Sequence, residues 1–111
     1  MKLSFINLGD GIPAQPVCFS LGAIEALEDE FGSLDAMRQS LVDGKVKSIN
    51  KVVEIMIAAG RAYCKGTGRD CPEPLPCRPA DLIDISDSSI VSELFAAMTN
   101  DSSRTVETRK N

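Results

Sequence analysis

Apolar and polar positions alternate over residues 2–8, and a second short apolar stretch follows at residues 17–19. Alternation with a period of two is typical of a strand that buries one face. A Gly-Asp-Gly sequence and Pro13 separate the two stretches, as in a turn or loop. We therefore predict a short N-terminal β-hairpin, which is marginal alone in water and needs helices or a neighbouring chain against it.

The spacing changes to that of a helix after Ser20, a residue type favoured at the N-cap. Apolar residues then recur on one face of the predicted helix, at Leu21, Ile24, Leu27 and Phe31. Gly32 suits the end of that helix, because glycine adopts positive φ at little cost. Ser33 can cap a second helix that ends at Gly44, so we expect a tightly bent helix pair.

A third helix is predicted to begin at Ser48 or Asn50, and residues 52–59 are apolar nearly all round. A helix of that kind is usually central and buried. A buried strand is the alternative, because valine and isoleucine are frequent there. The Ala-Ala-Gly-Arg-Ala sequence that follows favours the helix.

Residues 65–78 contain three prolines and two glycines without periodicity, which predicts a loop. Pro79 suits the first position of a short helix that reaches about Ile83. Ser86 or Ser88 would cap a last helix, whose inner side carries Ile90, Val91, Leu94, Phe95, Ala97 and Met98.

The sequence therefore predicts a mainly α domain of four to five helices with a short N-terminal β-hairpin. We place this single domain at residues 1–100 and a disordered tail at residues 101–111, where Val106 is the only sizeable apolar side chain. The residues predicted to form the core include Leu27, Phe31, Ile55, Met56 and Leu94.

Composition supports one globular domain, since 43% of the 111 residues are apolar and 25% are charged. The net charge of −4 argues against a nucleic-acid binder that relies on overall positive potential. No stretch approaches the roughly 20 apolar residues that span a bilayer. The N-terminal stretch is too polar for a signal peptide, so we expect the cytoplasm as location and no membrane partner.

Candidate chemistry is sparse. The chain has four cysteines and no histidine, and the cysteines lack the paired spacing of zinc sites. Three of them lie close together at Cys64, Cys71 and Cys77, either as loop thiols without a special role or as partners in a disulfide. The sequence shows no nucleophile–base pair and no phosphate-binding loop. We therefore expect no catalytic residues, no metal, no cofactor and no enzymatic activity.

Residues 19–33 read FSLGAIEALEDEFGS and follow the predicted hairpin. This arrangement resembles the tail assembly chaperones of long-tailed bacteriophages, prophages and gene transfer agents. The family's helix ends in Leu-Glu-x-x-Phe/Tyr-Gly-Ser, which residues 27–33 match, and residues 57–60 are similar to its Leu-x-Ala-Gly helix. The resemblance covers roughly residues 1–100, but the loop with cysteines and prolines after Ala62 is not a family feature.

The resemblance implies a non-enzymatic protein of the host cell cytoplasm that binds the tape measure protein, keeps it soluble and helps recruit tail tube protein. It also implies absence from the mature virion. A tape measure protein is largely helical and apolar, so its partner needs exposed apolar grooves or strand edges. The candidate interaction surface comprises Leu3, Phe5, Val17, Phe19, Glu25, Glu28 and Glu30. We also expect self-association through the hairpin edge or an apolar helix face.

We interpret the four acidic residues between 25 and 30 as a solvated helix face, since nothing in the sequence converges on them to bind a cation. The alternative function is a small cytosolic helical adaptor or regulator that binds a folded partner or nucleic acid. Nucleic-acid binding would require a basic patch made by Lys45, Lys47, Lys51 and Arg61.

Overall fold

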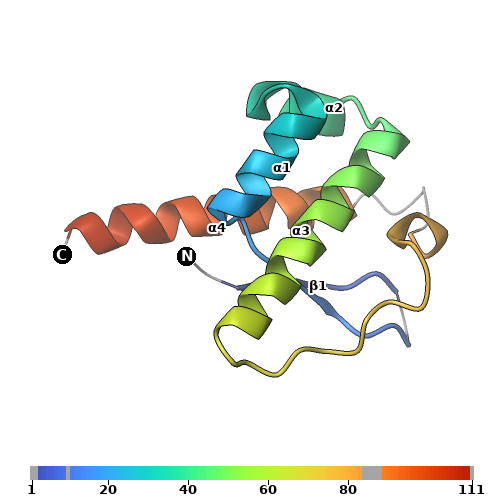
Figure 1. Cartoon of the computed structure of the whole chain (residues 1–111). Helices are drawn as coiled ribbons and strands as arrows, with labels where there is room; N and C mark the ends of the chain where they lie inside the picture. The colour runs from blue at the N-terminus through green and yellow to red at the C-terminus, as the bar shows by residue number, and fades with distance from the viewer. Residues whose placement is uncertain (1–2, 10, 84–88, 111) are drawn as a thin grey trace.

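The computed structural model describes residues 3–9, 11–83 and 89–110, and it describes side chains as far as residue 99. Within these residues the elements are β1 (Ser4–Ile6), β2 (Gln15–Val17), α1 (Leu21–Phe31), α2 (Leu34–Val42), α3 (Val46–Gly66), the 3-10 turn η1 (Pro79–Asp81) and α4 (Ser89–Lys110). The prediction of a mainly helical domain with an N-terminal hairpin is confirmed (Figure 1). The predicted caps Ser86 and Ser88 lie outside the described residues.

Local signals in the sequence fix the bent pair α1 and α2. The Ser20 hydroxyl accepts a hydrogen bond from the Ala23 nitrogen at 3.2 Å, as an N-cap should. Gly32 ends α1 with φ of 89°, a conformation that L side chains rarely adopt. The Ser33 hydroxyl then accepts from the Ala36 nitrogen at 3.0 Å, so one helix starts directly after the other ends.

The long helix α3 is the centre of the fold and contacts β2, α1, α2 and η1 (Figure 1). It begins at Val46, ahead of the predicted Ser48 or Asn50, and its N-cap Lys45 makes no side-chain capping hydrogen bond. The first residues of the helix are not packed, since Val46 is 54% exposed and the buried residues of α3 begin at Val52. The helix continues to Gly66, so the loop begins slightly later than predicted.

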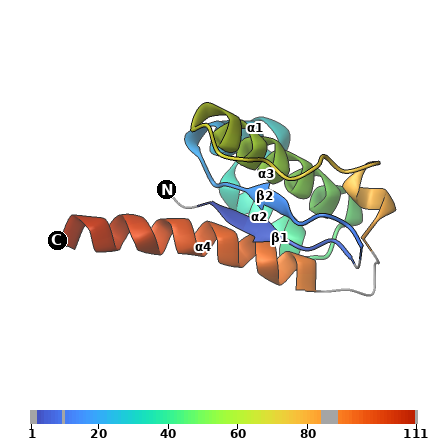
Figure 2. The same cartoon turned by 90° about the horizontal axis from the view of Figure 1, so that it is seen from below.

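The hairpin lies between helices, with α3 on one side and α4 on the other (Figure 2). The strands are antiparallel, with Phe5 opposite Pro16. The second strand lies at 15–17 instead of the predicted 17–19, and all three of its residues are buried. A proline is tolerated there because, within the part of the chain that the structure describes, β2 pairs only with β1. The helices supply the support that a two-stranded sheet lacks by itself.

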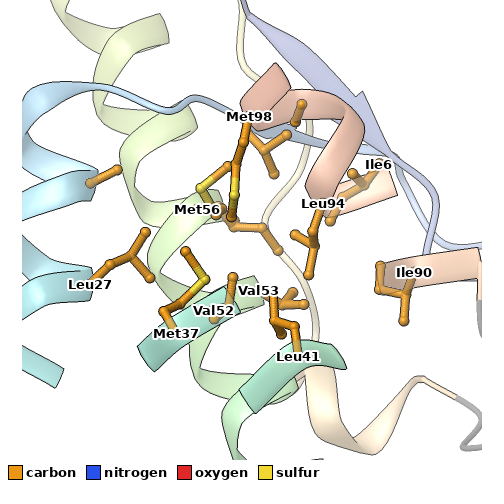
Figure 3. Packing of buried hydrophobic residues seen from close by; sticks show 14 of the residues in the cluster. Ile6, Leu27, Met37, Leu41, Val52, Val53, Met56, Ile90, Leu94 and Met98 are labelled. Carbon is orange, nitrogen blue, oxygen red and sulfur yellow. The ribbon is translucent and has the colours of Figure 1, made fainter. Parts of the chain in front are cut away.

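Side chains from α1, α2, α3, α4 and both strands meet in one core (Figure 3). The predicted core residues Leu27, Met56 and Leu94 are each 0% exposed, which confirms them. Phe31 and Ile55 are only half-buried at its edge, so their assignment to the interior was wrong. The reason for Phe31 is that α1 turns Ala23 and Leu27 inward, which rotates its buried face away from the predicted stripe.

The last helix also differs from the prediction. α4 runs without interruption from Ser89 to Lys110, through residues 101–110 that were expected to form a disordered tail. Its C-terminal turns extend away from the other elements (Figures 1 and 2). The stretch contains no glycine or proline, so nothing in its backbone chemistry ends the helix near residue 100.

Candidate functional site

An open groove of about 480 Å³ runs between α1 and the C-terminal half of α3. Its α1 side is made by Ser20, Gly22, Ala23 and Ala26. Its α3 side is made by Ile55, Ala58, Ala59, Ala62 and Tyr63. The groove exists because glycine and alanine face each other across the two helices, and such short side chains do not fill the space between the helix backbones.

Polar contacts mark both ends of this groove. Lys51 and Glu30 lie one helical turn beyond the groove residues of α3 and α1, and they form an ion pair of 3.9 Å across the two helices. At the other end, the Arg69 guanidinium lies 5.3 Å from the centroid of the Tyr63 ring, a cation–π contact. The floor between these ends is apolar.

The chemistry of the groove suits binding rather than catalysis. Ser20 holds its capping hydrogen bond to Ala23 at 3.2 Å, and the other groove residues except Tyr63 carry no polar side-chain atoms. Among the described residues, no group of three or more His, Cys, Asp or Glu side chains is placed to hold a metal ion. An apolar floor of this kind can accept the large side chains of an amphipathic helix, a common mode of peptide recognition.

The opposite side of α3 makes a closed contact with the hairpin. Gly60 lies so close to β2 that a Cβ at this position would overlap the Pro16 carbonyl group and lie 2.6 Å from the Val17 nitrogen. Only glycine allows a helix and a strand backbone to approach this far. The contact seals β2 against α3.

A hydrogen-bond network beside Gly60 ties the hairpin to the loop that follows α3. Gln15 is 0% exposed, and its amide nitrogen donates to the Glu73 carbonyl oxygen at 2.8 Å. The Gln15 amide oxygen accepts from Arg61 at 3.1 Å, and the same Arg61 nitrogen donates to the Pro72 carbonyl oxygen at 3.0 Å. The buried amide is thus satisfied on both ends, as a buried polar group must be.

A pair of thiols lies where this loop meets α3. Cys64 is buried and Cys71 is exposed, and the two thiols are close enough for Cys71 to affect the pKa of Cys64. Burial raises the pKa of the Cys64 thiol above its usual value, and the neighbouring Cys71 raises it further, while Arg69 and Arg61 act in the opposite direction. Cys64 is therefore a poor nucleophile near neutral pH.

The apolar half of the predicted interaction surface does not form one exposed patch. Val17 is 0% exposed and belongs to the core, which removes it from any surface in this fold. Leu3 and Phe19 are half-buried, and Phe5 is 51% exposed on β1. The hairpin was expected to carry exposed apolar residues and strand edges, but the helices on both sides cover most of its apolar side chains.

The acidic half is exposed, as a solvated helix face would be. Glu25, Glu28 and Glu30 all lie on the surface of α1. Glu30 stands one turn after Ala26 and so borders the groove, where it pairs with Lys51.

The four residues of the possible basic patch do not come together. Lys45 and Lys47 are exposed at the start of α3, whereas Arg61 lies about 21 Å further along the helix than Lys47. The Lys51 ammonium nitrogen lies 3.9 Å from a carboxylate oxygen of Glu30 and of Glu54. Arg61 donates hydrogen bonds to the Gln15 amide oxygen and the Pro72 carbonyl oxygen. The structure therefore offers no observation in favour of nucleic-acid binding by this set.

Comparison with known proteins identified no relative of this chain. A scan against protein-family models, a search of curated proteins and a search of solved structures each returned no match to this chain. No helix among the described residues is long and apolar enough to cross a membrane.

Sequence reasoning missed the groove and the contact at Gly60. Both depend on which faces of distant segments meet, and the alanines of α3 looked like ordinary core residues. One signal was available: a glycine inside an otherwise apolar helix costs stability unless something packs closely against it. Gly60 and the alanines at 58, 59 and 62 were therefore the residues to examine.

Proposed function

We propose that this protein is a tail assembly chaperone of a bacteriophage, prophage or gene transfer agent, and that it binds the tape measure protein through the groove between α1 and α3. On this proposal it acts in the host cytoplasm, keeps the tape measure protein soluble, helps recruit tail tube protein and is absent from the finished particle. It performs no chemistry.

One observation carries the proposal. The two segments that resemble the family, residues 19–33 and 57–60, lie on the two sides of the same groove. Gly22 and Ala26 come from the first segment, and Ala58 and Ala59 come from the second. Residues that resemble a binding family thus line the open apolar hollow, although they are far apart in the sequence.

The physical character of the groove supports the same partner. A tape measure protein is long, helical and apolar, and a floor of alanine and glycine lets a helix approach while its large side chains are buried. The gain in free energy comes from apolar area removed from water, about 25 cal/mol for each Å². The exposed acids of α1, such as Glu25 and Glu28, contribute mainly to solubility and to the rate of encounter.

Self-association is part of the proposal. Phe5 is 51% exposed on β1, and this strand pairs only with β2 among the described residues, so its second edge offers a place for another chain. Light scattering over a concentration series measures the effect, and replacement of Phe5 by Ser should reduce the average mass. A strict monomer at high concentration would contradict self-association, but it would not bear on binding of the tape measure protein in the groove.

Co-expression tests the main proposal. The tape measure protein of the same phage or prophage is produced with and without this chain, and its soluble fraction and co-purification are measured. We expect it to be soluble and bound only when this chain is present. Reversal of Glu25 and Glu28 to Lys should weaken the complex modestly and increase its dependence on salt. If the wild type neither binds nor solubilises the tape measure protein, the adaptor function replaces the chaperone.

A further inference from the structure

The loop between α3 and η1 turns back along the end of α3 instead of leaving the molecule. Three hydrogen bonds fasten it: Arg69 nitrogen to the Cys64 carbonyl oxygen at 2.9 Å, Arg61 to the Pro72 carbonyl oxygen at 3.0 Å, and Gln15 to the Glu73 carbonyl oxygen at 2.8 Å. These contacts stand on both sides of Cys71 in the sequence. The backbone of residues 69–73 is therefore held against the last turns of α3.

This arrangement brings two cysteines together. Cys71 precedes Pro72, which is bonded to Arg61, and Cys64 lies three residues after Arg61 on the neighbouring turn of the helix. The Arg69 nitrogen, two residues before Cys71, donates to the Cys64 carbonyl oxygen itself, so the loop passes directly over the end of the helix that carries Cys64. Cys71 is exposed and open to reagents, whereas Cys64 is buried beneath the loop.

We propose that Cys64 and Cys71 form a reversible disulfide that locks the loop onto the end of α3, with a low-molecular-weight disulfide such as glutathione disulfide as the oxidant. Because Gln15 bonds to Glu73 in the same loop, the lock also fixes the contact between the loop and β2. This inference is independent of the chaperone function.

The reaction is a thiol–disulfide exchange in two steps. The exposed Cys71 thiolate attacks one sulfur of the oxidant, the S–S bond of the oxidant breaks, and one small thiolate leaves. The Cys64 sulfur then attacks the Cys71 sulfur while its proton passes to the departing small thiolate, and the S–S bond of the mixed disulfide breaks. The protein loses two electrons and two protons, and one molecule of oxidant becomes two molecules of small thiol.

Closure brings the two sulfurs to about 2.05 Å, the length of a disulfide bond. The last turn of α3 is held by the helix, so Cys71 in the loop makes the approach. Cys77 is the other exposed thiol of the loop, and a variant without it provides the matched control.

Peptide mapping tests the proposal on the Cys77→Ser protein, which keeps only one exposed thiol. The protein is equilibrated in glutathione buffers, its free thiols are alkylated, and it is denatured and digested with trypsin. Cleavage after Lys65 and after Arg69 separates the two cysteines. We expect the peptide that contains Cys64 to remain joined to the peptide that begins at Asp70 until a reductant is added.

Stability supplies the second measurement. A disulfide that closes so short a loop should raise the melting temperature of the oxidised wild type by roughly 5 to 15 °C. Cys71→Ser changes an exposed residue, so it should fold normally and show neither the joined peptides nor the rise. The proposal is overturned if oxidation gives only glutathione adducts, only links between molecules, or a link between Cys71 and Cys77 in the wild type. If the peptides are joined but the melting temperature does not rise, the claim that the disulfide locks the loop onto α3 is overturned.

Discussion

Both sides of α3 carry small residues at a point of contact, yet one side is closed and the other is open. On the closed side, Gly60 meets the backbone of β2 at Pro16 without space for a Cβ. On the open side, Ala58, Ala59 and Ala62 face α1 across a hollow of about 480 Å³. The same helix thus packs against its own chain on one side and leaves short side chains uncovered on the other.

The difference shows that small residues do not by themselves indicate a packed interior. A glycine is required where a backbone passes at close range, since no side chain fits between them. Alanines that no other segment covers leave apolar surface in contact with water, at a cost in free energy that a bound partner would recover. The closed side should therefore respond to substitution through stability, and the open side through binding.

The largest effect is expected at Gly60. Replacing a glycine by alanine inside a helix normally gains about 0.5 to 1 kcal/mol, but here the new Cβ overlaps the backbone of β2. Gly60→Ala should lower the free energy of unfolding by about 3 kcal/mol, because strand and helix must separate. Urea denaturation measures it. Gly66→Ala is the control in the same helix, since nothing lies near its Cβ position, and it should be neutral or slightly stabilising.

The second-largest loss of stability on the closed side is expected when the hydrogen bonds of Gln15 are removed. Gln15→Leu keeps the size of the side chain but leaves the Glu73 carbonyl and Arg61 without this partner, so unfolding should become easier by about 1 to 3 kcal/mol. Gln39→Leu is the matched control, because Gln39 makes an exposed hydrogen bond to Asp43 and should matter by less than about 0.5 kcal/mol. Equal losses in the free energy of unfolding of the two variants would show that the buried network stabilises the fold no more than one exposed hydrogen bond does.

Two helix-cap variants that should lose similar stability allow a test of binding on the open side. Ser20→Ala and Ser33→Ala each remove one capping hydrogen bond and should each cost about 1 kcal/mol in thermal or urea unfolding. Only Ser20 lines the groove, so only its variant should also weaken capture of the tape measure protein. A similar loss of binding in both variants would assign the effect to stability alone.

The elements set by neighbouring residues were predictable from the sequence. Ser20, Gly32 and Ser33 carry their own conformational preferences, and the structure places each where the pattern indicated. Regular spacing of apolar residues was enough to identify the helices. The start of α3 was placed late, because the prediction relied on a capping side chain and the observed N-cap, Lys45, makes no such hydrogen bond.

Relations between distant segments were not predictable in the same way. No local feature of Gln15 indicates that a loop residue near 73 and a helix residue near 61 will enclose it. Helices were expected against the hairpin, but nothing near it in the sequence indicates which of its side chains they cover. Val17 was therefore assigned to the surface, although it is 0% exposed. Phe31 was assigned to the interior from the apolar stripe of its own helix, although it is only half-buried.

The most direct test of the account is the binding of a helical tape measure segment to variants of the open side, followed by fluorescence anisotropy. Ala62→Trp fills the groove from an exposed position, and Ala36→Trp places the same side chain at an exposed position of α2 away from it. Both should change stability by less than about 0.5 kcal/mol. We predict that Ala62→Trp weakens binding at least about tenfold while Ala36→Trp leaves it unchanged. Equal affinity of the two variants would contradict the claim that the groove between α1 and α3 is the binding site.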